Sequence, residues 1–400
     1  MTDLSKDPIQ KEHPMSTHRR TRTSNGISRR EFIGRGGAVV GGMALGATLL
    51  GAGSNAFASR LGDGPGGKLA VVNWPLYIDE KKKLLKDFEE ETGVNLKYSE
   101  TFNDNNEFFA KYQRQLSQGQ YPGFDIVVPT TWMAKRLIDL GYVQKLPFDD
   151  IPNAANLSPG FQNPPWDPAG EFTLPWQTGM TGIAYNIKIT GRELTSFNDL
   201  YDKKFKNKVG MLLEMRDTVG LACEAEGIDP ATVTYKKAGP ALDRLQKAVD
   251  AGQVRRFTGN DYQDDLVAGN FAACVSWSGD VAQHTLDNED LRFVIPDEGG
   301  MRWADTMVWV KSAKREPQVA AWMNFFYDQA NAAFLAAWLQ YISPVDGIEA
   351  ELAKIDPALA QSPLIFPPED VQARLKTFNQ DLSAKDEEKF DRRFAEISGS

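Results

Sequence analysis

The sequence has few of the residues that build redox and metal centres. Its 400 residues include two cysteines, Cys223 and Cys274, and three histidines. His13 and His18 lie in the N-terminal leader described below, so the rest of the chain has His284 alone. Zinc, haem and iron–sulfur sites take their ligands mainly from Cys and His, so the sequence argues against such centres. The two cysteines lie far apart on apolar segments and are either a disulfide pair or two buried thiols.

Catalytic motifs are missing as well. His284 has no G-x-S-x-G partner, and no Gly-rich phosphate-binding loop occurs. After the leader there is no internal repeat, no low-complexity tract and no apolar run of the ~20 residues that a membrane-spanning helix needs. We therefore expect a globular protein with no catalytic residues, no cofactor and no metal site.

The charge of the chain is unevenly distributed along the sequence. The composition, 42% hydrophobic and 25% charged, is ordinary for a globular protein, and the net charge is −9. The leader holds eight Lys/Arg and four Asp/Glu, a net +4, so the remainder carries −13. A negative field of this size repels nucleic acid and anionic lipid and attracts cations.

The leader has the pattern of an export signal. Residues 28–33, SRREFI, resemble the twin-arginine motif, and they stand before a weakly hydrophobic run, 34–50, that is rich in Gly and Ala. An A-x-A sequence follows at 56–58. The alternative, a membrane anchor, is disfavoured because the apolar run is shorter than ~20 residues. We predict a twin-arginine signal peptide at 1–58, cleaved after Ala58 and, with no Cys at the cleavage region, without a lipid anchor.

Two blocks of alternating strands and helices follow the leader, which is the pattern of α/β proteins with parallel sheets. The run 124–128 is almost continuously apolar, as a buried parallel strand is. In the first block we expect strands at 68–74, 94–99 and 124–128 and helices at 79–92, 105–117 and 132–140. In the second block we expect strands at 209–213, 254–257 and 272–277 and helices at 219–226, 240–251 and 262–268.

A surface connection rich in Pro, Asn and Gly, residues 153–170, lies between the blocks. We expect the chain to cross between two lobes at 176–182 and again at 303–310. The longest helical run is expected at 318–339 and a charged final helix at 369–397. The predicted fold is α/β, with two lobes and a ligand cleft between them: 68–178 plus about 304–345, and 179–303 plus about 346–398.

Indole and carboxylate side chains gather in the segment 271–310. Strands expected at 272–277 and 291–296 each end in polar residues, as strands that deliver side chains to a crevice do. Trp277 precedes Asp280, and Trp303 precedes Asp305. Aromatic faces attract an organic cation and carboxylates accept its ammonium hydrogen bonds, so the pattern predicts a cleft for such a cation. For Asp280, which precedes VAQHTL, a helix-capping role is an equally good interpretation.

Five runs resemble one family, the periplasmic spermidine- and putrescine-binding receptors of polyamine ABC importers. They are NWPLYID at 73–79, FDIVVPTTW at 124–132, GMTGIAYN at 179–186, WSGDVAQ at 277–283 and PDEGGMRWADTM at 296–307. The resemblance implies a two-lobed periplasmic-binding-protein fold and a soluble, extracytoplasmic, monomeric receptor. It also implies capture of a polyamine for a membrane permease, with no enzymatic activity and no nucleic-acid partner.

The resemblance also implies a set of ligand-binding residues, matched position by position. They are Trp74, Tyr77, Thr130, Trp132, Glu214, Asp217, Trp277, Asp280, Trp303, Asp305 and Tyr341. The chain departs from the family pattern where Pro75 and Leu76 replace polar or acidic residues, and where Arg216 stands inside the acidic pair. Because Leu76 brings no charge, we expect a shorter diamine to be preferred over a longer triamine.

Three other functions are compatible with parts of this pattern. A receptor for a quaternary amine needs the indoles but not the carboxylate hydrogen bonds. An exported hydrolase would use Asp280 and Asp305 as acid and base. A calcium receptor would use the carboxylates, but a hard cation gains little from indole walls.

Overall fold

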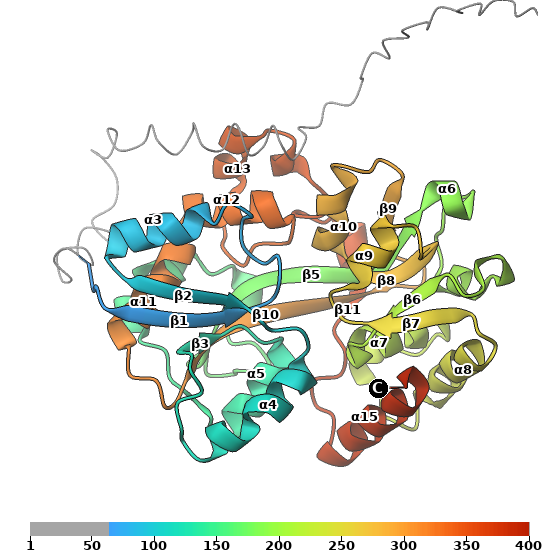
Figure 1. Ribbon diagram of the computed structural model, residues 1–400, viewed down its shortest axis with the longest axis horizontal. Coiled ribbons are helices and arrows are strands. Elements are labelled where there is room, and N and C mark those ends of the chain that lie inside the picture. The colour runs from blue at the N-terminus through green and yellow to red at the C-terminus, as the bar shows by residue number, and fades with distance from the viewer. Residues whose placement is uncertain (1–63, 400) are drawn as a thin grey trace, which may run out of the picture.

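The protein is described here by a computed structural model that covers residues 64–399. The predicted signal peptide, 1–58, lies outside the described residues. A twisted sheet runs across the molecule with helices on both of its faces (Figure 1). No helix within residues 64–399 is long and apolar enough to cross a membrane.

The first block of the sequence forms one end of the sheet. Its strand β1 is buried at all positions after Lys68 and pairs in parallel with both β2 and β3. The helix predicted from Asp79 begins instead at Lys83, because the Asp79 carboxylate accepts hydrogen bonds from the backbone of Lys83 and Leu84 at 2.7 and 3.1 Å. The elements are β1 Lys68–Asn73, α3 Lys83–Thr92, β2 Asn95–Glu100, α4 Asn105–Ser117, β3 Ile126–Val127, α5 Thr131–Asp139 and β4 Val143–Gln144.

The second block forms the other end of the sheet. Strand β6 pairs in parallel with β7 and β8. The helix predicted at 219–226 begins at Met215, since Glu214 caps it. The elements are α6 Ile187–Thr190, β6 Val209–Leu212, α7 Met215–Ala225, α8 Gly239–Asp250, β7 Val254–Thr258, α9 Tyr262–Val267, β8 Ala273–Trp277, α10 Ser278–Thr285 and β9 Leu291–Val294.

Two long strands cross the middle of the molecule, as the sequence predicts. They are β5, Thr173–Asn186, and β10, Gly300–Val310, and they pair with each other in antiparallel fashion. Because of this pairing the strand order is continuous, β2-β1-β3-β10-β5-β8-β6-β7, where two separate sheets were expected. The crossing segments are therefore the centre of one sheet as well as the link between its ends (Figure 1).

The side chains nevertheless pack in two main hydrophobic clusters. The first takes residues from 69–176 and 307–365, and the second takes residues from 183–301 and 378–397. Trp322 is fully buried in the first, with its ring centroid 5.2 Å from that of Phe88. These clusters support the two-lobed architecture, and we propose that residues up to Ile365 belong with the first lobe, beyond the predicted boundary at 345.

The C-terminal quarter differs from the sequence prediction in two places. The run 318–339 is two helices, α11 Glu316–Phe326 and α12 Gln329–Leu339, because Asp328 accepts hydrogen bonds from two backbone N–H groups and starts a new helix. The segment 369–397 is not one helix. It contains α14 Glu369–Ala373, β11 Leu375–Lys376 and α15 Ala384–Ser398, and it follows the short helix α13 Glu349–Ile355. Helix α15 buries an apolar stripe in the second cluster.

The remaining elements are single turns of 3₁₀ helix. The predicted surface connection 153–170 contains two of them. They are η2 Phe148–Asp150, η3 Pro152–Asn156, η4 Pro159–Phe161, η5 Phe197–Tyr201, η6 Lys203–Phe205, η7 Pro230–Thr232 and η8 Leu359–Gln361. Cys223 and Cys274 are both buried and both free, so the disulfide alternative is wrong.

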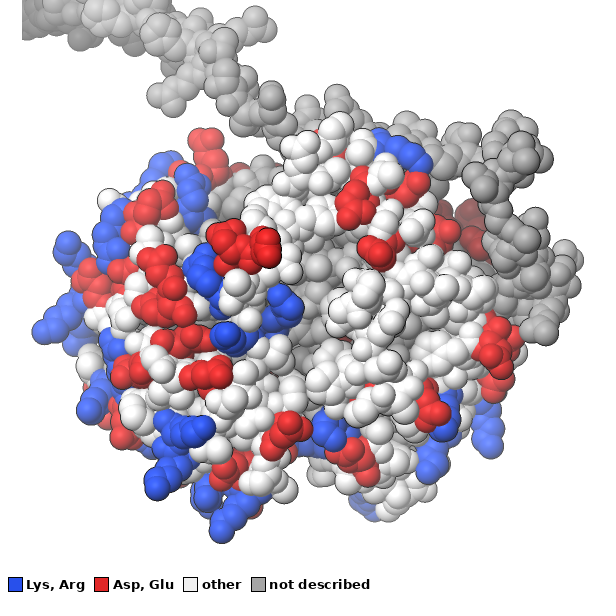
Figure 2. Space-filling model, turned by 180° about the vertical axis from the view of Figure 1, so that it is seen from behind, with Lys and Arg blue, Asp and Glu red and all other residues white. Residues whose placement is uncertain are grey.

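Charged side chains of both signs are mixed over the surface. Seen from behind, Lys and Arg alternate with Asp and Glu around the rim, and the hollowed centre of this face carries few of either (Figure 2). Nucleic-acid-binding proteins gather basic side chains on one face. The face shown in Figure 2 has no such patch.

Candidate ligand-binding cleft

A cleft lies where the two lobes meet. It has about 870 Å³ of space not filled by atoms, part of it open to solvent. The structure brings all of the sequence-predicted site residues together in its walls. They are Trp74, Tyr77, Thr130, Trp132, Glu214, Asp217, Trp277, Asp280, Trp303, Asp305 and Tyr341.

The carboxyl ends of parallel strands place most of these side chains. Trp74 and Tyr77 follow β1, Glu214 lies between β6 and α7, and Asp280 stands in the first turn of α10, directly after β8. Ligands of open α/β sheets bind at these strand ends. The crossing strand β10 adds Asp305, where its register with β5 shifts, and such irregularities often redirect a side chain toward a site.

Asp305 is a buried carboxylate with a free oxygen. Its side chain is 5% exposed, and its Oδ2 accepts a hydrogen bond from the Tyr77 hydroxyl at 2.9 Å. Its Oδ1 is buried without a hydrogen-bond partner in the described chain. Burial raises the pKa of Asp305 to about 7, against the opposing effect of the Thr130 and Tyr77 hydroxyls. This oxygen can accept a hydrogen bond from a ligand.

Asp280 is held by three neutral donors. It accepts hydrogen bonds from Tyr341 Oη at 2.8 Å and from Tyr262 Oη and Gln263 Nε2 at 3.0 Å each. Burial raises the pKa of Asp280 to about 6. The helix-capping interpretation of Asp280 is wrong, because the residue at the start of α10 is Trp277 and no side chain caps that end.

Aromatic rings surround these two carboxylates. The ring centroids of Trp277 and Trp303 are 6.4 Å apart, and those of Trp303 and Tyr341 are 5.3 Å apart. Burial raises the pKa of Tyr77 and of Tyr341 well above the usual value for a phenol, so both stay protonated and donate to the acids. Within residues 64–399 no ion pair involves Asp280 or Asp305; we call these two the unpaired acids.

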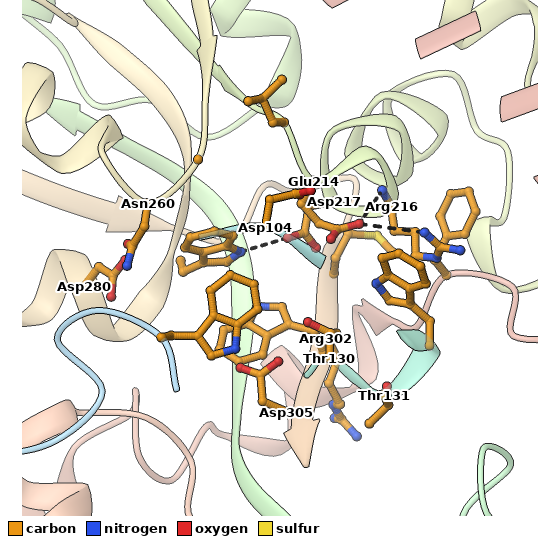
Figure 3. Close-up of a pocket in the computed structure, with 18 of the residues that line it drawn as sticks. Asp104, Thr130, Thr131, Glu214, Arg216, Asp217, Asn260, Asp280, Arg302 and Asp305 are labelled. Atoms are coloured by element: carbon orange, nitrogen blue, oxygen red, sulfur yellow. Dashed lines mark hydrogen bonds and ion pairs between the residues drawn. The ribbon is translucent and has the colours of Figure 1, made fainter. Parts of the chain in front are cut away.

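Two further carboxylates of the cleft, Glu214 and Asp217, lie close enough to Arg216 for its charge to favour their ionised forms, and we call them the paired acids. Glu214 accepts a hydrogen bond from the backbone of Arg216 at 3.2 Å, and its Oε1 lies 4.0 Å from the Arg216 guanidinium. Asp217 accepts a hydrogen bond from Trp277 Nε1 at 2.8 Å. Burial raises the pKa of both acids, and the charge of Arg216 opposes the rise. Figure 3 shows Asp280 at one end of the cleft and Arg216 at the other.

Several residues of the site were not predicted from the sequence. Tyr262 and Gln263 hold Asp280, and Asn105 donates to Thr130 Oγ1 at 2.9 Å and to Glu214 Oε2 at 3.4 Å. Tyr262 and Gln263 are the first residues of the helix after β7. They lie just beyond the carboxyl end of a strand, the same position that identified Asp280 as a candidate, so the sequence could have indicated them. Further lining residues are Pro75, Asn103, Asp104, Thr131, Leu213, Arg216, Gly259, Asn260, Met301, Arg302, Thr377, Phe378 and Gln380.

Comparison with known proteins places this arrangement in a family. Residues 83–367 match the family model described as bacterial extracellular solute-binding protein. The chain belongs to this family. The predicted resemblance is confirmed by relatives of this solute-binding protein, each similar over most of its length. Spermidine/putrescine-binding periplasmic protein 1 of Haemophilus influenzae is 27% identical over 75% of this chain and 81% of its own. The putrescine-binding periplasmic protein PotF of Escherichia coli is 26% identical over 77% and 85%.

Solved structures confirm the predicted two-lobed fold of this solute-binding protein. The spermidine/putrescine ABC transporter substrate-binding protein PotD of Streptococcus pneumoniae superposes with a TM-score of 0.69 at 25% identity, over 83% of this chain and 98% of its own. A putative spermidine/putrescine ABC transporter protein of Listeria monocytogenes gives 0.72 at 26% identity, over 82% and 98%. These relatives are binding proteins of transporters rather than enzymes.

Proposed function

We propose that this solute-binding protein binds a linear polyamine, putrescine or spermidine, outside the cytoplasmic membrane and delivers it unchanged to the permease of an ABC importer. The observation that carries the proposal is that the cleft contains two buried carboxylates without an ion-pair partner, the unpaired acids. Asp280 and Asp305 are buried among indoles and phenols, and neither forms an ion pair within residues 64–399. A buried carboxylate without a partner is costly, so the ligand is expected to bring the positive charges.

The chemistry of an alkyl diamine matches the walls of the cleft. Its ammonium groups donate hydrogen bonds to the free Oδ1 of Asp305 and to Asp280, and its methylene chain lies against the Trp277 and Trp303 rings. The named relatives, which are polyamine-binding proteins, support the same ligand class. Closure of the lobes over the ligand would create the surface that the permease recognises, provided the ligand binds the closed state better.

Calorimetric titration tests the proposed ligand class directly. Putrescine, cadaverine and spermidine are titrated into the mature protein, with choline and Ca²⁺ as probes of the two other receptor classes. We expect saturable binding of at least one linear amine and none of choline or Ca²⁺. Choline binding without amine binding would favour the quaternary-amine function. Turnover of any amine in the same cell, followed by mass spectrometry, would contradict a purely binding role.

We further propose that the protein is a monomer exported by the twin-arginine route. The motif at 28–33 and the A-x-A sequence at 56–58 support this route. Replacing Arg29 and Arg30 by Lys should leave the precursor inside the cell, as seen by fractionation and immunoblotting. A variant with Lys at Arg19 and Arg20 is the matched control and should be exported. Normal export of the Arg29/Arg30 variant would show that another route is used.

A further inference from the structure

Arg216 is a cation of the chain that lies inside the cleft. Its guanidinium carbon lies 3.6 Å from the centroid of the Trp132 ring, a distance at which a cation and an aromatic face attract each other. The side chain is 10% exposed. Arg216 and Trp132 both line the cleft, and the paired acids adjoin them (Figure 3). The Trp132 ring is therefore already in contact with a positive charge of the chain.

Ion pairs fix the position of this guanidinium. Arg216 Nη2 lies 2.6 Å from Glu387 Oε1, and the same oxygen lies 3.0 Å from Arg136 Nη2. Glu387 belongs to α15, which packs in the second cluster through Phe390, whereas Arg136 and Trp132 belong to α5 of the first lobe. The guanidinium is thus held by Glu387 of the second lobe and by the Trp132 ring of the first. It is a fixed part of the cleft wall.

We propose that Arg216 is a specificity-determining residue, a built-in cation that takes the place of one ammonium group beside Glu214 and Asp217, so that the cleft accepts a diamine and rejects a triamine. This inference rests on the proposed function. A diamine places its two charges at Asp280 and Asp305 and leaves the paired acids to Arg216. A triamine is longer and brings a third ammonium group toward the guanidinium, where like charges repel in a poorly solvated site.

The cause of this selectivity differs from the one that the sequence suggested. Leu76, which replaces an acid, is 48% exposed and does not line the cleft, although its neighbours Pro75 and Tyr77 do. The missing negative charge at position 76 weakens the binding of diamines and triamines alike. Arg216 distinguishes ligands by their length, because only a ligand with a third charged group reaches the guanidinium.

The test compares Arg216→Met with Arg216→Lys by calorimetric titration with putrescine and spermidine. We expect the parent to bind spermidine at least about tenfold more weakly than putrescine. In Arg216→Met the ratio of the two dissociation constants should shift toward spermidine by about tenfold or more, since Met fills the space without the charge. Arg216→Lys should keep the parent's preference, because a cation remains beside the paired acids. An unchanged ratio in Arg216→Met, or the same shift in both variants, overturns the proposal.

Two further variants keep the test decisive if Arg216→Met folds poorly. The double variant Arg216→Met with Glu387→Gln removes the cation together with its anionic partner and should show the same shift toward spermidine. Glu387→Gln alone leaves the guanidinium in the cleft and should keep the diamine preference. A shift toward spermidine in Glu387→Gln alone would mean that loosening of α15 sets the selectivity, and the role of Arg216 would be rejected.

Titration of the parent protein with putrescine and spermidine distinguishes a failure of the proposed function from a failure of the role of Arg216. If the parent binds no linear amine at all, the proposed function fails, and the role of Arg216 in choosing among amines is rejected with it. If the parent binds spermidine as well as putrescine, or better, the proposed function stands and the role of Arg216 is rejected. Thermal unfolding of each variant identifies those that are folded at the titration temperature.

Discussion

The cleft contains two pairs of carboxylates that differ in whether a cation of the chain lies beside them. Asp280 and Asp305 are buried and receive hydrogen bonds only from uncharged groups. Glu214 and Asp217 are also in the cleft, but Arg216 lies beside them and lowers the cost of their ionisation. The number of carboxylates in a cleft is therefore a poor guide to the charge of its ligand, because only those without a cation of the chain require one from outside.

The largest expected effect comes from removing one of the unpaired acids. Asp305→Asn should weaken diamine binding by at least about thirtyfold, since truncating one partner of a buried charge pair costs on the order of 2–5 kcal/mol. Asp217→Asn is the matched variant on the paired side. It should weaken binding less, because Asn still accepts the hydrogen bond from Trp277 and Arg216 remains nearby. Titration calorimetry of both variants with putrescine decides the comparison.

The opposite order would refute this account of the cleft. If Asp217→Asn weakened putrescine binding more than Asp305→Asn, the ammonium groups would bind mainly to the paired acids. The charge of Arg216 would then not compensate those acids. If neither Asp305→Asn nor Asp280→Asn had an effect, the cleft would not be an amine site.

A second, smaller effect is expected from pH. The unpaired acids must be ionised to bind an ammonium group, and in the empty protein the pKa is raised to about 7 for Asp305 and about 6 for Asp280. The amine itself stays protonated over this range, as a lysine does. Below pH 7 binding must first release protons, so affinity falls as pH falls. Between pH 8 and pH 6 the dissociation constant for putrescine should rise by roughly twentyfold.

The same titrations sharpen the distinction between the two acidic sets. Asp305→Asn removes the group with the higher of these two pKa values, so the pH dependence of its residual binding should become shallower between pH 8 and pH 6. Heat measured in buffers of different ionisation enthalpy reports the number of protons released on binding. Equal proton release by the parent and by Asp305→Asn would contradict the assignment.

The smallest expected effect concerns a hydrogen bond behind an unpaired acid. Tyr341→Phe removes the donor that lies 2.8 Å from Asp280 Oδ1, which makes the ionised form of Asp280 less stable. A hydrogen bond of this kind contributes about 0.5–1.5 kcal/mol, so putrescine should bind about two- to tenfold more weakly. Tyr327→Phe is the control, since its hydroxyl donates to Pro175 in the core of the first lobe, 2.7 Å away. Its affinity should match that of the parent, and an equal loss in both variants would point to general loosening.

The sequence predicted the cleft well because its residues lie in short local runs. Trp277 and Asp280 are found together, as are Trp303 and Asp305, and the strand-end rule explains why they converge. The sequence did not predict the partners of Arg216, because Glu387 is separated from it by 171 positions and only tertiary packing unites them. A local signal was available for the break between α11 and α12, since Asp328 is a good helix cap inside an otherwise apolar run.

The antiparallel pairing of β3 with β10 sets a condition on how the protein folds. Strand β3 has two residues and lies between β1 and β10 in the sheet. Until residues 300–310 have been synthesised, β3 can pair only with β1. At roughly 5–20 residues per second, a ribosome takes on the order of ten seconds to reach them after β3. During this interval the sheet that contains the apolar strands β1 and β3 is incomplete. The pairing of β3 with β10 also forms slowly, because the two strands are far apart along the chain. We therefore expect a nascent chain that ends before β10 to remain incompletely folded, because the partner strand of β3 is still missing.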